Sequence, residues 1–355
     1  MGDHRRAALL RASVGIPTED RPSADDWDGW MWAARMERLI PQLYALACAG
    51  RLGLADEQFR QAEAMQLDVA SLCLRLEHAL IDVAALFDGA GVRFAVLKGG
   101  ATCHLDYEDP SQRQFGDIDV LIDPVDMDRA RLLLEREGWA QAYPLPRHHK
   151  RFAHAVTFKT AGIAELDLHQ RIAHRALGLL APSDELLRRR ISFEIAGRPL
   201  WALSDVDRLI HASLHALASR GPYRRLSSVA DVLVLSDRLL ALSEEVLEQA
   251  ESWSLRPLVQ AAIEDAHAEA RLELPDAWRS AIRAPLGRRN RLVERAYLAE
   301  QRRPVVEEVA HLLLLDGWGD RFRYLTGYFH LEDGTASTSL SSRLRYLLSR
   351  LRRRA

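Results

Sequence analysis

The fold is decided by two neighbouring segments, Val92-Arg-Phe-Ala-Val-Leu-Lys-Gly-Gly100 and Phe115-Gly-Asp-Ile-Asp-Val120. Each is typical of a short buried strand, and a Gly-Gly break ends the first. Side chains at i and i+2 of a strand point to the same face, so Asp117 and Asp119 are predicted to project together. Two aligned carboxylates can bind hard divalent cations, which prefer oxygen ligands. The pattern therefore predicts a metal-binding strand beside a glycine turn that lets a ligand approach the backbone.

A second acidic strand is expected downstream. Residues 151–169 predict a β-hairpin with its turn at Ala161-Gly162. Its second arm places Glu165, Asp167 and His169 on one face and two leucines on the other. Acids that share a strand face repel each other unless a cation or a base compensates, which favours a functional face over a merely solvated one.

The sequence around these strands is mostly helical and predicts an α+β fold. Residues 1–60 are expected to form an N-terminal lead-in with helices, of which residues 1–29 are extended or loosely docked. Residues 61–180 are expected to form a core with a small mixed β-sheet and flanking helices. Residues 181–355 are expected to be a mostly helical C-terminal region.

Apolar periodicity and breakers place the individual helices. Gly89 and Gly91 are expected to end the longest helical stretch, and Ser204 to Asp207 resembles a capping box. The expected helical stretches are residues 30–50 with a break at Pro41, 58–91 as one or two helices, 126–136, 204–217, 226–240, 244–270 with a break at Pro257, 292–315, and a basic tail at 342–354.

Composition excludes several classes of protein. The net charge of −2 gives no overall attraction to nucleic acid. The three cysteines are odd in number and widely spaced, which predicts neither a disulfide framework nor a metal site. No apolar run approaches the roughly 20 residues that span a bilayer, and no secretory signal is evident. We therefore expect a cytoplasmic protein without a membrane span.

Three carboxylates from two strands, Asp117, Asp119 and Asp167, suit nucleotidyl transfer with two metal ions. Two cations roughly 3.5–4 Å apart stabilise the attacking and the leaving oxygens during displacement at a phosphate. Because Lys98 stands beside the glycine turn, its ammonium group can reach a phosphate oxygen. The backbone amides of the Gly99-Gly100 turn can face a triphosphate.

These residues resemble a known family. Leu97-Lys-Gly-Gly100 followed by Gly116-Asp-Ile-Asp-Val-Leu-Ile122 resembles the polymerase-β-type nucleotidyltransferase superfamily. Within it, the closest similarity is to an uncharacterised bacterial nucleotidyltransferase group with a Leu-Lys-Gly motif. That group also has an acidic strand ending in histidine, which Glu165-Leu-Asp-Leu-His169 resembles, and later helical His and Arg-Leu-x4-Asp elements. The matching later positions are His211, His215, Arg225, Leu226 and Asp231, so the resemblance covers roughly residues 60–240.

The resemblance implies roles for the acidic residues. Asp117 and Asp119 would hold both metals. Asp167 would hold the catalytic metal and help to deprotonate the acceptor, with Glu165 as the alternative third carboxylate. The expected ions are two Mg²⁺, with Mn²⁺ as the other candidate.

Two further features qualify the resemblance. Arg113 would contact phosphate or pair with an acid of the site, with an exposed salt bridge as the alternative. The spacer between Gly100 and Asp117 is longer than in the superfamily. Residues 104–114 are therefore expected to loop out and to help form an acceptor pocket.

The expected activity moves a nucleoside monophosphate from a nucleoside triphosphate, such as ATP, to a hydroxyl-type acceptor and releases pyrophosphate. The acceptor is a small molecule, a peptide or a protein, with a peptide or small metabolite favoured. The near-neutral charge counts against a nucleic-acid acceptor. Two alternatives are a non-catalytic nucleotide-binding module and a toxin-like tRNA nucleotidyltransferase.

Histidines add less specific signals. His211 and His215 have the i, i+4 spacing of zinc ligands, but without a third ligand they are expected to be buried helix residues lining the cleft. His148, His149 and His154 lie among basic residues and are expected in an exposed polar loop, with phosphate binding as the alternative.

Overall fold

The computed structural model describes residues 3–16, 26–143, 154–160, 164–174, 177–218 and 225–299, with short pieces between 309 and 322. Two predicted features, the basic tail at 342–354 and the histidines at 148 and 149, lie outside the described residues. None of the described helices is both long and apolar enough to cross a membrane.

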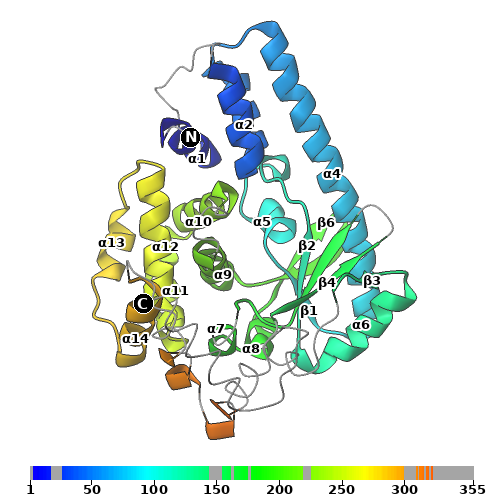
Figure 1. The fold of residues 1–355 in the computed structure, drawn as a ribbon, viewed down its shortest axis with the longest axis vertical. Helices are drawn as coiled ribbons and strands as arrows, with labels where there is room; N and C mark the ends of the chain where they lie inside the picture. The colour runs from blue at the N-terminus through cyan, green and yellow to red at the C-terminus, as the bar shows by residue number, and fades with distance from the viewer. Residues whose placement is uncertain are drawn as a thin grey trace, which may run out of the picture.

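One mixed β-sheet forms the centre of the fold (Figure 1). Its strand order is β3-β4-β5-β2-β1-β7-β6. The pairs β2–β5 and β1–β7 are parallel, and the other four pairs are antiparallel. The strands are β1 (Phe94–Val96), β2 (Ile118–Ile122), β3 (Ala140–Gln141), β4 (Ala155–Lys159), β5 (Glu165–His169), β6 (Ile191–Ile195) and β7 (Arg198–Ala202). This sheet with its helices confirms the predicted α+β class, and the antiparallel pairing of β4 with β5 confirms the two arms of the predicted hairpin. The predicted turn at Ala161-Gly162 lies outside the described residues.

Helices surround the sheet and form a separate bundle. Figure 1 shows the sheet beside the lower half of α4, with the bundle of α9 to α14 on the opposite side of the molecule. The α-helices are α1 (Asp3–Ser13), α2 (Trp27–Glu37), α3 (Ile40–Cys48), α4 (Asp56–Gly89), α5 (Gly99–Leu105), α6 (Met127–Arg136), α7 (Leu177–Leu180), α8 (Ser183–Arg188), α9 (Asp205–Ala218), α10 (Leu226–Arg238), α11 (Ser243–Ser252), α12 (Arg256–Glu269), α13 (Asp276–Ile282) and α14 (Arg288–Tyr297).

The sheet is buried on both faces. On β1, Phe94 and Val96 belong to the apolar cluster shared with α4, whereas Ala95 belongs to the cluster of the helical bundle. Leu121 of β2 also joins the bundle cluster. Because successive strand residues alternate between faces, Asp119 lies on the same side of β2 as Leu121. The acidic face predicted from the sequence is thus directed towards the bundle.

Helix ends follow the predicted signals. Residues 56–89 form one continuous helix, and Gly91 has a φ of +68°, the left-handed conformation that glycine adopts most readily just after a helix. Pro41 and Pro257 each stand in the first turn of a new helix, where a missing N–H group costs nothing.

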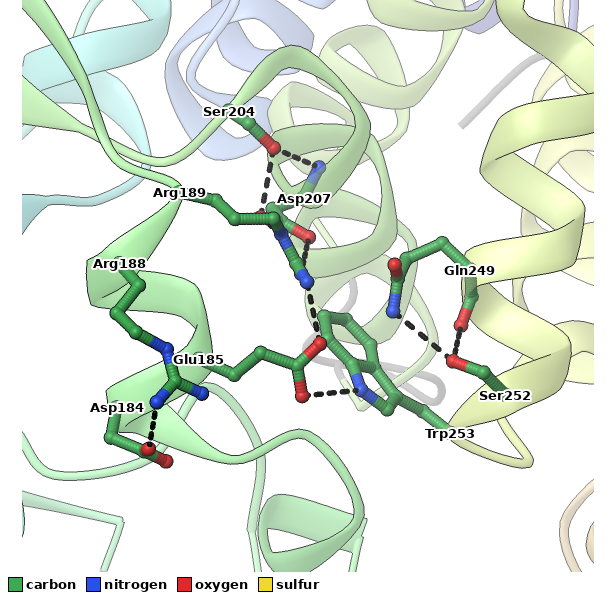
Figure 2. A network of polar contacts seen from close by, with 9 residues as sticks. All are labelled: Asp184, Glu185, Arg188, Arg189, Ser204, Asp207, Gln249, Ser252 and Trp253. Atoms are coloured by element: carbon green, nitrogen blue, oxygen red, sulfur yellow. Dashed lines mark hydrogen bonds and ion pairs between the residues drawn. The ribbon is translucent and has the colours of Figure 1, made fainter.

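The predicted capping residue Ser204 also takes part in a larger polar network (Figure 2). The backbone N–H of Asp207 donates to the hydroxyl of Ser204 at 3.3 Å. Arg189 bridges the buried Asp207 carboxylate at 2.7 Å and Glu185 at 2.5 Å, and Trp253 donates to Glu185 at 3.4 Å. This network connects the end of α8 to the start of α9 and to the residue that follows α11.

The prediction of an extended or loosely docked lead-in was wrong where the structure describes it. Residues 3–13 are not an extended lead-in but form α1, because Leu9 and Leu10 are fully buried against the bundle. The predicted mostly helical region after residue 180 also contains β6 and β7, which extend the sheet.

The spacer before Asp117 does not loop out as predicted. It begins as α5 and continues into a short 3-10 helix at Pro110–Gln112. Its polar residues have partners in the bundle: Asp106 forms a buried bidentate ion pair with Arg208 at 2.8 and 3.0 Å. The spacer is therefore a packed connection between the sheet and the bundle.

Gly99 is expected to tolerate no side chain. A Cβ atom at this position would lie 2.4 Å from the Cβ of Phe115, so backbone or strand must move. Gly99→Ala should lower the free energy of unfolding by about 1–3 kcal/mol, as overpacking does. Gly89→Ala is the matched control, because no atom lies within 4 Å of its Cβ position and alanine favours the helix. Urea denaturation measures both; equal effects would contradict this packing role.

Candidate functional site

Strand register brings the predicted acids together. In the parallel pair β2–β5, Asp119 is the direct partner of Asp167. Their strands are separated in sequence by α6, β3 and β4, yet are neighbours in the sheet. His169 follows two residues after Asp167 on the same face of β5. One edge-to-edge pairing thus assembles two carboxylates and an imidazole.

Asp119 lies at the centre of the site. It is only 3% exposed, and its Oδ1 atom lies 2.6 Å from Nζ of Lys98 and 2.7 Å from Nε2 of His169. Burial acts to raise the pKa of Asp119, but the charge of Lys98 and the contact with His169 outweigh it and hold that pKa well below its usual range. Asp119 therefore carries a full negative charge inside the protein.

Lys98 reaches Asp119 from a strained backbone. Its φ is +48° with ψ −137°, a conformation that residues other than glycine rarely adopt. Burial acts to lower the pKa of Lys98, but the carboxylate of Asp119 outweighs this effect and the pKa is raised. The lysine is thus a permanent cation. Its ion pair with Asp119 offsets the cost of the strained backbone, which is about 1–3 kcal/mol.

The structure separates the two candidates for the third carboxylate. Asp167 accepts a hydrogen bond from the hydroxyl of Thr157 at 2.6 Å and lies beside Asp119. Glu165 instead pairs across the hairpin with Lys159 at 2.8 Å, where both side chains are more than 40% exposed. Asp167 therefore belongs to the acidic centre, and Glu165 to the surface.

Asp117 lies just before β2 and is more open than Asp119. Its side chain is 35% exposed, and Oδ1 lies 3.7 Å from a guanidinium nitrogen of Arg38. Burial raises the pKa of Asp117, and the negative charge of Asp119 adds to the rise. A cation bound next to both carboxylates would relieve this repulsion.

The other predicted site residues, Gly99, Gly100 and Arg113, take part in packing and in a buried ion pair. Gly99 and Gly100 are the first residues of α5 and are buried, so the expected open turn is a helix start packed on Phe115. Arg113 is 7% exposed and forms a bidentate ion pair with Asp231, with distances of 2.6 and 2.7 Å. The alternative of an exposed salt bridge is therefore wrong. In this structure the guanidinium of Arg113 is directed to Asp231 and not to the acidic centre.

The two helical histidines predicted from the sequence lie near Lys98. His211 and His215 of α9 line a small cavity with Lys98 and Asp231. Burial, with the nearby charge of Lys98, lowers the pKa of His215 to about 3 and that of His211 well below its usual value. Both imidazoles are therefore neutral near pH 7.

His154 belongs to the same neighbourhood through its stacking partners. Its ring centroid lies 5.3 Å from that of His169 and 3.5 Å from that of His174. Burial, together with the nearby His174, lowers the pKa of His154 to about 3. The exposed polar loop expected around residue 154 is thus not what the structure shows at this position.

Arg38 is a site residue that the sequence did not reveal. It follows α2 in the left-handed conformation, with a φ of +56°, and extends to Asp117 from a segment far away in the chain. No motif surrounds it. The only local signal was the interruption of the helical pattern before Pro41.

The donor set is suitable for a divalent cation. Asp119, Asp167 and His169 each offer a ligand atom, and these atoms lie within 4.8 Å of one another. The nitrogen Nδ1 of His169 is buried without a hydrogen-bond partner among the described residues. Two carboxylates suit Mg²⁺, whereas the imidazole is a better ligand for Mn²⁺ or another transition metal. Asp117 lies outside this group of three.

Comparison with known proteins identifies the family. A family model described as "Uncharacterised nucleotidyltransferase" matches residues 23–269, well over half of the chain. The chain belongs to this nucleotidyltransferase family. The match confirms the resemblance inferred from the Leu-Lys-Gly and Asp-x-Asp segments, and membership implies a nucleoside triphosphate as substrate.

Solved structures similar to this nucleotidyltransferase are distant. One is the crystal structure of an antigenic nucleotidyltransferase-like protein from Paracoccidioides brasiliensis, with 17% identity, a TM-score of 0.37, and coverage of 60% of this chain and 94% of that one. Another is the solution structure of the antibiotic-resistance factor ANT(2'')-Ia, with 17% identity, a TM-score of 0.38, and coverage of 54% and 96%. Curated proteins give no match.

Proposed function

We propose that this nucleotidyltransferase moves a nucleoside monophosphate from a nucleoside triphosphate to a hydroxyl-type acceptor in a reaction that depends on divalent cations. The observation that supports this proposal most is the pairing of Asp119 with Asp167 across β2 and β5. Nζ of Lys98 lies 2.6 Å from Oδ1 of Asp119 at the same place. In the reaction, an acceptor oxygen forms a bond to the α-phosphorus, the bond from that phosphorus to the bridging oxygen breaks, and pyrophosphate leaves.

The carboxylates are assigned to cation binding and proton removal. Asp117, Asp119 and Asp167 would hold two Mg²⁺ ions, or Mn²⁺ where His169 contributes. Bound metal would stabilise the charge that develops on the phosphate oxygens in the transition state. Asp167 is proposed to take the proton from the acceptor hydroxyl. Its Oδ1 atom accepts a hydrogen bond from Thr157, and its other oxygen would receive the proton.

Basic residues are assigned to the triphosphate. Lys98 is a compact ammonium beside the acids, and Arg38 is a half-exposed guanidinium 3.7 Å from Asp117. A guanidinium can donate two parallel hydrogen bonds to a phosphate group, so Arg38 suits the outer phosphates. The backbone amides of Gly99 and Gly100 are proposed as additional donors to the same group.

The acceptor is proposed to be a peptide or a small metabolite. The net charge of −2 gives no overall attraction to a long nucleic acid, whose binding rests on several phosphate contacts. A hydroxyl group within reach of Asp167 is the chemical requirement that the site places on the acceptor.

Product mass tests the proposal directly. The protein is incubated with mixed nucleoside triphosphates and a small-molecule and peptide extract, with and without Mg²⁺ or Mn²⁺. We expect pyrophosphate release and a new product heavier than its acceptor by one nucleoside monophosphate residue, and both should disappear with a chelator. Binding of a triphosphate without divalent cation and without any product would instead indicate a non-catalytic nucleotide-binding module.

Two carboxylates of one strand provide a matched pair of variants. Asp167→Asn should reduce transfer by about 10³-fold or more, because loss of one charged ligand removes several kcal/mol of transition-state stabilisation. Glu165→Gln should stay within about twofold of wild type, since its partner is the exposed Lys159 and such pairs contribute about 0–1 kcal/mol. Turnover of labelled triphosphate measures both. The opposite ranking would assign the third carboxylate to Glu165.

A further inference from the structure

A second group of metal-ligating side chains lies between α4 and the C-terminal part of α5. Glu77 of α4 and the adjacent residues Cys103 and His104 of α5 have ligand atoms within 4.8 Å of one another. Oε1 of Glu77 lies 2.9 Å from Nε2 of His104. None of the three residues is among those proposed above for nucleotide transfer.

The chemistry of this group differs from that of the acidic centre. It offers one thiol sulfur, one imidazole nitrogen and one carboxylate oxygen, which are the three ligand types that Zn²⁺ takes from proteins. Mg²⁺ prefers oxygen and does not select such a set. We propose that Glu77, Cys103 and His104 form a binding site for Zn²⁺ that fastens α5 to α4.

The observed geometry is near that of an occupied site. With zinc–ligand distances of about 2.0–2.1 Å and tetrahedral angles, an oxygen and a nitrogen ligand lie about 3.3 Å apart. The 2.9 Å between Glu77 and His104 therefore needs to widen by only about half an ångström. The ring of His104 is held by Phe193, whose centroid lies 6.2 Å away, so its direction is already restricted. The Cys103 sulfur lies within 4.8 Å of both atoms and would have to lie about 3.6 Å from each in a tetrahedral site.

Partial exposure of two of the three side chains gives solvent access to the site. The sulfur-bearing side chain of Cys103 is completely buried, whereas Glu77 and His104 are 14% and 16% exposed and open a path from solvent. Burial raises the pKa of the Cys103 thiol, and the carboxylate of Glu77 adds to this rise. Zinc binding would displace the thiol proton to solvent, because the thiolate is the ligand.

The position of the site suggests its consequence. Cys103 and His104 belong to the helix that begins at Gly99 and carries Lys98 at its N-cap. Fixing this helix to α4 would hold Lys98 against Asp119. Cys73 lies one turn before Glu77 on α4 and exchanges hydrogen bonds with the backbone of Phe115, so the same region also supports the segment leading to Asp117.

Cobalt substitution tests the site in the full-length protein. Co²⁺ bound by a thiolate gives a sulfur-to-cobalt charge-transfer absorption, which the sulfur-free acidic centre cannot produce. We expect this absorption to saturate at one Co²⁺ per chain and to be displaced by Zn²⁺. It should vanish in Cys103→Ser and persist in Cys48→Ser, whose exposed cysteine is the matched control.

Two variants that retain the sulfur guard against misfolding as an explanation. His104→Ala and Glu77→Gln should each weaken Zn²⁺ binding by at least about 100-fold, since even outer-shell changes often cost 10–100-fold. Their secondary structure is checked by circular dichroism. Absence of the charge-transfer absorption in wild type, or its survival in Cys103→Ser, would overturn the proposal. Wild-type zinc affinity in folded His104→Ala would do the same.

Discussion

Asp119→Asn is expected to lower the rate of nucleotide transfer by at least about 10³-fold. The carboxylate of Asp119 accepts hydrogen bonds from Lys98 at 2.6 Å and from His169 at 2.7 Å. It is also the direct partner of Asp167 in the neighbouring strand. Asparagine keeps the shape but removes the charge that a cation and the lysine both require. A thousandfold loss corresponds to about 4 kcal/mol, within what a metal contributes to the transition state.

The variant must be distinguished from an unfolded protein. Removing the Asp119 charge leaves the buried ammonium of Lys98 without its partner, so some loss of stability is expected as well. Circular dichroism and binding of triphosphate without divalent cation show whether the fold survives. Lys98→Met/Asp119→Asn provides the control, because it removes both charges; it should recover stability but not turnover. Wild-type turnover in folded Asp119→Asn would exclude the proposed mechanism.

Local pattern was sufficient to predict much of the acidic centre. Alternation along β2 and β5 places Asp119, Asp167 and His169 on predictable faces, and the hairpin that carries β5 was evident from its turn. What alternation could not decide was the choice between Asp167 and Glu165, which share a face. The parallel register of β5 against β2, a non-local property, pairs Asp167 with Asp119.

Features that depend on distant partners were missed or misjudged. The spacer after Gly100 was expected to loop out. Instead, its Asp106 forms a buried ion pair with Arg208 of α9. A buried charge is stable only with such a partner, and nothing in the local sequence identifies it. Residues 3–13 were misjudged similarly, since Leu9 and Leu10 are buried only through the bundle.

Side chains that converge from separate helices carry even less sequence signal. Arg38 reaches Asp117 from the end of α2, and Glu77 reaches Cys103 from the middle of α4. Spacing rules for metal sites detect ligands on one helix or one knuckle, so the wide separation of the cysteines suggested no site. The family signature pointed to the acidic strands, whereas helix packing determines which distant side chains lie near them.

Arg113 is where the sequence-based role and the structure make opposing predictions. If Arg113 contacts the triphosphate, Arg113→Ala should weaken substrate binding and leave stability nearly unchanged. In the structure Arg113 instead forms a bidentate pair with Asp231, and Tyr107 donates to the same carboxylate at 3.1 Å. Both charged side chains are 8% exposed. Arg113→Ala would leave the Asp231 charge buried without compensation.

We therefore expect Arg113→Ala to lower the free energy of unfolding by about 3–5 kcal/mol, the usual result of removing one partner from a buried ion pair. The thermal midpoint should fall on the order of 10 °C. Arg113→Met/Asp231→Leu should recover part of this loss, because it removes both charges and fills the space with apolar groups, although the hydroxyl of Tyr107 loses its acceptor. Thermal and urea denaturation measure stability, and titration with a triphosphate measures binding. A stable Arg113→Ala protein with weakened triphosphate binding would return Arg113 to the nucleotide site, whereas an unstable one rescued by the double change assigns it to the contact between the spacer and α10.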